Sequence, residues 1–285
     1  MDRDPIHPDP THTDLKHTDL KHPDPTHTDL KHTDLKHTDL KHTDLKHSVI
    51  DPAILYFGTP VVLVSSTNED GSPNLAPISS AWWLGKSCLL GFGARSKTPA
   101  NILRTGQCVL NLPSVEQVAA VDRLARTTGS DPVPPHKQAM GYRHEADKFG
   151  TAGLTPVPSD RVTPPRVAEC PVQLEAVLES SHPIAESDPQ ARGHLIALET
   201  RISRVHIDDR LRMEGHRDRI DPLRWRPLIM SFCQFFGLGP MLHPSTLAEI
   251  PESAYRPPKV SRPPSTHAQI PSHAKMETEK GAIPC

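Results

Sequence analysis

The chain has 285 residues, 32 of them proline, and a formal net charge of −2 at pH 7. This near-neutral charge gives no electrostatic basis for a nucleic-acid or acidic-membrane partner, and no apolar run approaches the roughly 20 residues that span a bilayer. The N-terminus lacks the apolar core of a secretory signal, and the five cysteines form no CxxC pair. We therefore expect a cytoplasmic protein, in a reducing compartment, with about 200 residues of ordered chain.

A five-residue unit, His-Thr-Asp-Leu-Lys, dominates the first 47 residues. Its period of five matches neither the helical period of 3.6 nor the strand period of 2. Each perfect unit offers one leucine, which is too little apolar surface to offset the entropy of ordering. We therefore predict that residues 1–47 are disordered. The regularly spaced histidines suit divalent metal ions, with merely adventitious metal affinity as the alternative.

Regular secondary structure is expected from Ser48, and the predicted domain covers residues 48–244. Apolar and β-branched runs bounded by turn residues predict extended segments at 61–65, 74–84, 87–93 and 107–112. A short helix is expected between the third and fourth of these segments. Thr98 suits its N-cap, Pro99 its first position and Gly106 its C-terminal cap.

The second half of the predicted domain alternates between apolar runs and loops. A helix is expected over 114–126, loops over 129–168, strands at 171–179 and 194–207, and an apolar closing segment at 227–237. From about residue 245 the chain becomes rich in proline, so 245–285 is predicted to be a disordered or polyproline tail. Many strands with few helices predict a mainly β, α+β domain, namely a small β-barrel with helical cover.

A turn rich in glycine, hydroxyl and basic residues precedes the first predicted helix. In the segment Gly91–Thr98, Arg95 and Lys97 supply positive charge, while Ser96 and Thr98 supply hydroxyl donors. The helix that follows presents free N–H groups and the positive end of its dipole. These features predict a phosphate site. An ordinary strand-to-helix turn with two solvated basic residues is the alternative.

The same turn differs by one residue from the P-loop of nucleotide hydrolases. Ser96 stands where the P-loop pattern requires a glycine, whose backbone wraps the phosphate. Pro99 removes a backbone donor where a P-loop helix continues, and no later apolar strand ends in an aspartate suited to Mg²⁺. We therefore do not expect ATP or GTP hydrolysis.

A second motif places two serines among large apolar neighbours. Ser79 and Ser80 lie between Ile78 and the tryptophan pair that begins at Trp82. A flavin ring needs apolar walls for its body and a few donors for its carbonyl oxygens and ring nitrogens. The motif suits a flavin, and a barrel strand whose serines bond the neighbouring backbone is the alternative.

Several separated motifs, taken in order, resemble the flavin reductase-like family. They are Val61-Val-Leu-Val-Ser65, Asp70-Gly-Ser-Pro-Asn-Leu-Ala-Pro-Ile-Ser-Ser80, Lys97-Thr-Pro-Ala-Asn-Ile102, Thr105-Gly with Val109-Leu-Asn-Leu112, Asp147-Lys-Phe-Gly-Thr-Ala-Gly-Leu-Thr155, Pro164-Pro-Arg-Val-Ala-Glu-Cys-Pro-Val-Gln-Leu-Glu175 and Arg204-Val-His-Ile-Asp208. Each motif is weak alone, but their common order over roughly residues 50–240 makes the resemblance specific.

This resemblance implies an FMN-binding split β-barrel that works as a homodimer. By the likeness, the isoalloxazine ring and ribityl chain would lie against Asn74, Ser79, Ser80, Ala81 and Trp82. The FMN phosphate would be held by Arg95, Ser96, Lys97 and Thr98, with Asn101 nearby. The loop over 128–158 is expected to cover the flavin or to reshape its pocket.

The resemblance also implies an NAD(P)H-dependent flavin reductase, in which NADH or NADPH gives hydride to flavin N5 and a monooxygenase is the partner. Since the flavin performs the chemistry, no catalytic triad or carboxylate pair is required, and no catalytic residue or metal site is assigned. Candidates to assist nicotinamide binding are His194, His206 and His216, with surface or strand histidines as the alternative. The alternative function is a non-catalytic flavin carrier or sensor.

Overall fold

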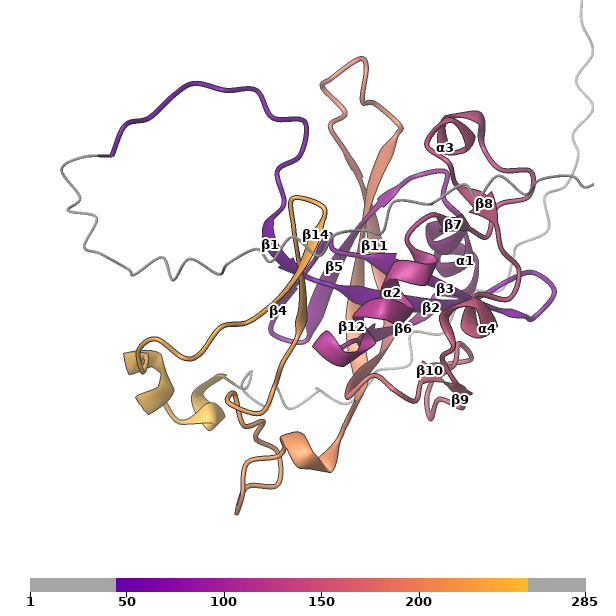
Figure 1. Cartoon of the computed structure of the whole chain (residues 1–285). Coiled ribbons are helices and arrows are strands. Elements are labelled where there is room, and N and C mark those ends of the chain that lie inside the picture. The colour runs from indigo at the N-terminus through magenta and orange to yellow at the C-terminus, as the bar shows by residue number, and fades with distance from the viewer. Residues whose placement is uncertain (1–44, 256–285) are drawn as a thin grey trace, which may run out of the picture. The chain divides into compact units, whose positions relative to one another are not determined.

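The computed structural model describes residues 45–255, and a compact unit begins at Pro52. The predicted disorder of residues 1–47 falls almost entirely outside the described residues, as does the predicted tail beyond Tyr255. The main strands of the unit are β2 (Val62–Thr67), β3 (Pro73–Ile78), β4 (Ala81–Leu84), β5 (Ser87–Gly93), β6 (Gln107–Leu112), β11 (Val172–Ile184) and β12 (Leu195–Ile207). They form one antiparallel sheet in the order β3-β2-β6-β11-β12-β5-β4 (Figure 1).

The two edge strands of this sheet, β3 and β4, are consecutive in the chain. Only Ser79 and Ser80 join them, so at about 3.8 Å per residue the Cα atoms of Ile78 and Ala81 lie within about 11 Å of each other. A sheet whose first and last strands are this close must curl round on itself. The result is a barrel that is split between β3 and β4, which confirms the predicted mainly β, α+β fold.

This topology corrects one predicted element. The single extended run expected over 74–84 is two strands, because the chain crosses from one edge of the sheet to the other at the serine pair. Its apolar and β-branched residues were compatible with one strand. The break depends on pairing with β2 on one side and β5 on the other.

The sheet is buried on both faces, which explains the continuous apolar run of β2. Val62 and Val64 belong to a core cluster made mainly by the strands, together with Leu90 of β5. Val61 and Leu63 belong to a second cluster, in which residues of two helices pack on the other face. Successive side chains of a strand point to opposite faces, so both sets are apolar.

The first helix, α1 (Lys97–Thr105), begins slightly earlier than predicted. Its N-cap is Ser96 and not Thr98, because Ser96 has the extended backbone of a cap residue. Its C-terminal end agrees with the prediction. Gly106 has a φ of 70° and donates its N–H to Ile102 O at 2.8 Å, a left-handed conformation that favours glycine.

The helix predicted over 114–126 is divided into a 3₁₀ turn, η2 (Val115–Gln117), and a helix, α2 (Val118–Leu124). Ser114 starts it through a capping box. The Ser114 N–H donates to Gln117 Oε1 at 2.9 Å, and Ser114 Oγ accepts from Glu116 N at 3.2 Å.

Short elements interrupt the region that was expected to be loops. They are β7 (Thr127–Thr128), α3 (Pro135–Ala139), β8 (Arg143–His144), α4 (Lys148–Ala152), β9 (Pro156–Val157) and β10 (Arg166–Val167). β7 pairs with β8, β9 pairs with β10, and α4 packs against α2. The region therefore folds onto the barrel as a small layer and is not one long loop.

The C-terminal part of the unit adds a small second sheet. Its strands are β1 (Phe57–Pro60), β13 (Leu228–Ser231) and β14 (Gln234–Gly237). One 3₁₀ turn, η3 (Asp209–Leu211), precedes β13, and two more, η4 (Thr246–Glu249) and η5 (Glu252–Tyr255), follow β14. β11 continues beyond the predicted end at Glu179 and past the last residue that pairs with β6, and the loop of its hairpin with β12 projects from the sheet (Figure 1). Among the described residues, no helix is long and apolar enough to cross a membrane.

The four described cysteines are free. Burial raises the pKa of the Cys88 and Cys108 thiols to about 12. As expected for cysteines inside apolar strands, both therefore act as small core residues and not as nucleophiles.

Candidate functional site

The split between β3 and β4 borders a cavity of about 470 Å³. Ser79 and Ser80, which cross the split, line this cavity together with Gly91 of β5. The Ser80 Oγ donates to Gly91 O, and Gly91 N donates to Ser80 O, both at 2.7 Å. A Cβ added at Gly91 would lie 3.0 Å from Ser80 Cβ, so a larger residue would press against this closure of the split.

The N-terminus of α1 forms one end of the cavity. Ser96, Lys97 and Thr98 all line it. The Ser96 side chain makes no capping hydrogen bond to the helix, and the first turn holds no acidic residue. The free N–H groups and the helix dipole therefore favour an anion at this end of the cavity.

Three lysines from three helices line the cavity: Lys97 of α1, Lys137 of α3 and Lys148 of α4. The Lys137 Nζ donates to Ser96 Oγ at 3.2 Å. The Lys97 Nζ is paired with Glu69 at 2.5 Å, but the Glu69 side chain is 61% exposed. Exposed ion pairs are weak, so a bound anion can compete with Glu69 for Lys97.

Burial makes two of these lysines costly to protonate in the folded protein. Lys148 is only 3% exposed, and burial, followed by repulsion from Lys137, lowers its pKa to about 8 although Glu145 opposes the shift. Burial also lowers the pKa of Lys137. Positive charge held in a poorly hydrated place without a matching anion is typical of a binding site for an anionic group.

The structure brings five of the ten predicted cofactor-binding residues to the cavity: Ser79, Ser80, Ser96, Lys97 and Thr98. The other five do not line it: Asn74, Ala81, Trp82, Arg95 and Asn101. On β4, Ala81 is buried in the core and Trp82 is 53% exposed on the opposite face of the strand. Because the five lining residues share one cavity, the turn before α1 and the serine pair lie together in the fold, although they are separated in the sequence.

Asn74 and Asn101 lie beneath the α1 terminus in a buried polar network. The Asn74 Nδ2 donates to Ser66 Oγ and to Thr98 Oγ1, both at 3.0 Å. The Asn101 Nδ2 donates to Ser66 Oγ at 3.2 Å and to Asn68 Oδ1 at 2.8 Å. This network holds the first turn of α1 against β2 and the turn that follows it. Both asparagines therefore position the wall of the cavity from behind.

One wall of the cavity comes from a part of the chain where the motifs predicted no site residue. The lining residues between β7 and α4 are Thr127, Thr128, Gly129, His136, Lys137, Tyr142 and Lys148. The sequence signal for them was the length of the loop-rich region, which indicates function or cover over a site without identifying residues. The expectation that the 128–158 segment shapes the pocket agrees with this wall.

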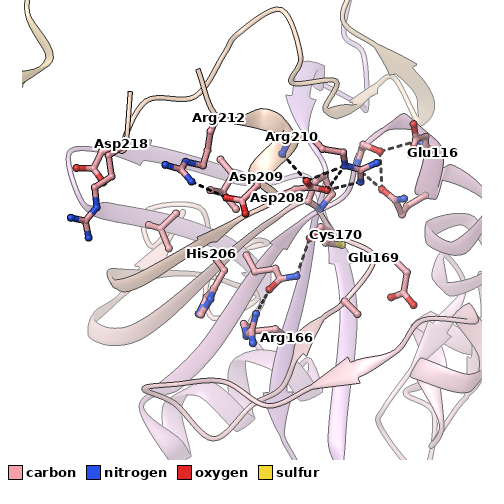
Figure 2. A pocket seen from close by; sticks show the side chains of 18 residues that line it. Glu116, Arg166, Glu169, Cys170, His206, Asp208, Asp209, Arg210, Arg212 and Asp218 are labelled. Atoms are coloured by element: carbon pink, nitrogen blue, oxygen red, sulfur yellow. Dashed lines mark hydrogen bonds and ion pairs between the residues drawn. The ribbon is translucent and has the colours of Figure 1, made fainter. Parts of the chain in front are cut away.

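A second cavity, of about 690 Å³, lies where β11 begins and β12 ends (Figure 2). Its lining includes four arginines and five carboxylates, so it has no excess of positive charge. Arg210 is paired with Asp208 at 2.5 Å, and Arg212 with Asp209 at 3.0 Å. Of the three predicted nicotinamide histidines, His206 lines this second cavity, and none lines the cavity at the split.

The cavity at the split has two chemically different parts. The lysines, hydroxyls and helix terminus supply charged and polar groups, while Ile78, Phe92 and Met230 add apolar surface. Its volume falls in the range of about 300–1,000 Å³ that is usual for small-ligand sites. The arrangement suits a ligand with a phosphate at one end and a flat apolar body at the other.

Comparisons with known proteins agree with this geometry. A family model described as the flavin reductase like domain matches residues 54–218. A protein of Bacillus subtilis named uncharacterized protein YdfE is 35% identical over 190 residues, which cover 67% of this chain and 88% of that protein. A model for pentapeptide repeats matches eight copies over residues 11–48, nearly all of which lie outside the described part of the chain.

Solved structures share the fold. The flavoredoxin of Desulfovibrio vulgaris has 22% sequence identity and a TM-score of 0.57, with 72% of this chain and all of that chain covered. Nitrilotriacetate monooxygenase component B from Bacillus cereus has 21% identity and a TM-score of 0.55, with 70% and all of the respective chains covered. At these identities the likeness concerns the fold alone.

Proposed function

Because the chain belongs to the flavin reductase-like family, a family of flavin-binding oxidoreductases, we propose that it binds FMN and reduces flavin with NADH or NADPH. The observation that carries the choice of FMN is the convergence of Lys97, Lys137 and Lys148 on the N-terminus of α1. FMN differs from riboflavin by its phosphate, and charge-assisted hydrogen bonds to a phosphate are among the stronger ones in proteins.

The residues at the split fit the two parts of FMN. The phosphate would be held by Ser96, Lys97, Thr98, Lys137 and Lys148, with Arg95 in the same turn. The ring would lie at the serine pair, Ser79 and Ser80. Ala81 and Trp82 on the adjoining strand do not line the cavity, and Asn74 and Asn101 would support the phosphate end from behind. The backbone at Gly129 also approaches the Asn74 side chain closely, since a Cβ added at Gly129 would lie 2.8 Å from Asn74 Oδ1.

Bound FMN would supply the atom that accepts hydride, flavin N5. The protein's own residues then have three tasks: they anchor the phosphate, orient the ring at the split and exclude water from its apolar side. The lysines and hydroxyls that line the cavity support this division of labour. It leaves the choice between NADH and NADPH to residues outside the phosphate end.

We further propose a homodimer in the cytoplasm. Large apolar side chains are exposed on and beside the small sheet, among them Phe57 at 73%, Phe236 at 54% and Leu238 at 64%. Exposed apolar patches of this kind usually mark interaction surfaces. The four free cysteines support a reducing compartment. A monooxygenase that consumes reduced flavin is the proposed partner, by analogy with the neighbour named nitrilotriacetate monooxygenase component B.

Three measurements test the proposal. Purified protein should show the visible absorption bands of flavin, or gain them with added FMN. FMN should bind at least about tenfold more tightly than riboflavin, which corresponds to about 1.4 kcal/mol. NADH or NADPH should be oxidised when FMN is present and not when it is absent. Tight FMN binding without oxidation of either nucleotide would favour the alternative, a flavin carrier or sensor. Equal affinities for the two flavins would contradict the phosphate site.

A further inference from the structure

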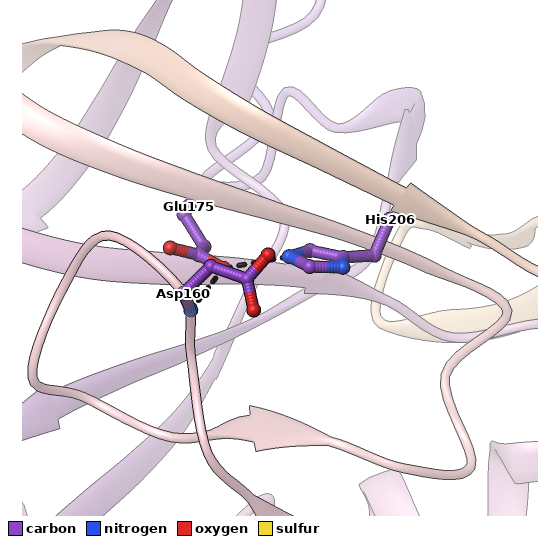
Figure 3. Close-up of side chains that lie close together, drawn as sticks. All are labelled: Asp160, Glu175 and His206. Carbon is purple, nitrogen blue, oxygen red and sulfur yellow. Dashed lines mark hydrogen bonds and ion pairs between the residues drawn. The ribbon is translucent and has the colours of Figure 1, made fainter.

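Asp160, Glu175 and His206 come from three separate segments and meet beside the main sheet (Figure 3). Glu175 belongs to β11, His206 to β12 and Asp160 to the connection between β9 and β10. One ligand atom from each residue lies within 4.8 Å of the other two. The His206 Nε2 and Glu175 Oε1 atoms are only 2.6 Å apart.

The contacts of Glu175 show that its carboxylate is held in a fixed orientation. The side chain is fully buried, and Oε1 accepts the N–H of Asp160 at 2.8 Å while Oε2 accepts the N–H of Arg161 at 2.6 Å. Burial alone would raise the pKa of Glu175, but these N–H groups and His206 outweigh it and lower the pKa. Glu175 is therefore an ionised, oriented carboxylate.

The orientation leaves coordination positions open. A carboxylate has about four lone-pair sites, and the two backbone N–H groups use two of them. In the absence of a metal, His206 Nε2 and Glu175 Oε1 share a short hydrogen bond. A cation bound to both residues would replace this hydrogen bond and take the Nε2 lone pair, with the ring hydrogen on Nδ1.

We propose that Asp160, Glu175 and His206 bind a divalent metal ion of the Mn²⁺ or Zn²⁺ type between β11 and β12. One imidazole nitrogen and two carboxylates suit these ions, with water completing the coordination. The Asp160 side chain is 48% exposed and supplies the third ligand from the solvent side. The sequence predicted no such site because the ligands lie 15 and 31 positions from Glu175, outside any short metal-binding pattern.

Arg204 provides a competing cation for the same site. Its Nε lies 3.6 Å from the Asp160 carboxylate, so in the metal-free protein it offsets part of the negative charge that the ion would neutralise. A metal and Arg204 therefore compete for Asp160. Removal of the arginine should strengthen metal binding, whereas removal of any true ligand should weaken it.

The test measures Mn²⁺ binding to the full-length chain by the electron paramagnetic resonance signal of free Mn²⁺. The histidine-rich repeat is present in every variant, so its binding is a common background. Asp160→Asn and His206→Gln should each weaken one Mn²⁺ site at least tenfold, since even the outer partners of metal ligands affect affinity 10–100-fold. Arg204→Gln should strengthen that site, and added Zn²⁺ should displace Mn²⁺ from it.

His182→Gln is the matched control. The His182 Nε2 lies 3.7 Å from Glu199, which reproduces the histidine–carboxylate pair without the third ligand, so this variant should keep the parent's site. Melting curves in chelator check that each variant is folded. If His206→Gln fails to fold, the Asp160→Asn variant tests the metal site alone, because the Asp160 side chain is exposed and its replacement should not disturb folding. Parent-like Mn²⁺ number and affinity in Asp160→Asn would overturn the proposal.

Discussion

The Lys137 Nζ donates a hydrogen bond to Ser96 Oγ at 3.2 Å, which joins α3 to the N-cap residue of α1. The two residues are 41 positions apart. The contact places a second cation at a helix terminus that already favours an anion. It also connects the layer of short elements over 127–152 to the turn that follows β5.

Lys137→Ala should weaken FMN binding about tenfold or more, because one charge-assisted contact to the phosphate is lost. Riboflavin binding should hardly change, since riboflavin has no phosphate. Fluorescence titration with both flavins measures the two affinities. Lys86→Ala is the control, because Lys86 lies in the turn before β5 and does not line this cavity. A parallel loss for both flavins would indicate general damage.

Two single substitutions compare how much Arg95 and Lys97, the basic residues before and at the start of α1, contribute to FMN affinity. Lys97 lines the cavity and Arg95 does not, so Lys97→Ala should reduce FMN affinity by about tenfold and Arg95→Ala by less. Both variants should stay folded with melting temperatures near the parent's, since Arg95 is exposed and the ion pair that Lys97 loses is with the exposed Glu69. An equal loss in the two variants would show that the phosphate also reaches Arg95, as the motif predicted.

Lys148→Met should stabilise the protein while it weakens FMN binding. The folded pKa of about 8 lies below the ordinary 10.5, so the unfolded chain binds more protons and stability rises with pH between these values. Below pH 8 the charged lysine costs on the order of 3 kcal/mol, which the methionine variant would regain. Denaturant unfolding at pH 7 and pH 10 tests this. A gain at pH 7 that did not shrink at pH 10 would contradict it.

FMN affinity of the parent protein should also fall above pH 8, as Lys148 loses its charge, and Lys148→Met should be less sensitive to pH in this range. The control is riboflavin, whose affinity should follow neither change. These titrations need only the flavin fluorescence and no turnover.

Gly129→Ala should lower FMN affinity through geometry alone. The new Cβ would lie 2.8 Å from Asn74 Oδ1 and 3.2 Å from Lys97 Cγ, so the buried asparagine or the lysine must move. We expect a destabilisation of about 1–3 kcal/mol, typical of overpacking, and weaker FMN binding. Gly239→Ala is the control, because nothing lies within 4 Å of its added Cβ. A Gly129→Ala variant with parent-like flavin affinity would show that Asn74 is free to shift.

Deletion of residues 1–47 should leave the melting temperature and the FMN affinity unchanged. The reason is the five-residue period, which builds no continuous apolar face for packing against the domain. The full and truncated chains are compared in the presence of a chelator, so that metal bound to the repeat does not contribute. A clear loss of stability on truncation would show that the repeat packs on the domain.

Local patterns in the sequence determined the main elements and the central motif. The β-branched run at Val61–Ser65 predicted a buried strand because both faces of β2 are covered. Gly106 and Ser114 marked the end of α1 and the start of the next helical segment through cap chemistry that depends on a few adjacent residues. The turn before α1 indicated a phosphate site because its basic and hydroxyl residues are adjacent in sequence to a helix N-terminus.

Only the tertiary structure decided which side chains share the cavity. The break at Ser79 and Ser80 exists because the sheet curls until its edges meet, which no local pattern encodes. Lys137 and Lys148 reach α1 through the packing of a layer whose own elements are too short to be recognised. The resemblance placed Asn74 and Asn101 near the ligand, and only the fold shows that their Nδ2 groups donate to Ser66 beneath the α1 terminus. Sequence reports the chemistry of each residue and its near neighbours, whereas distances across the fold depend on the whole chain.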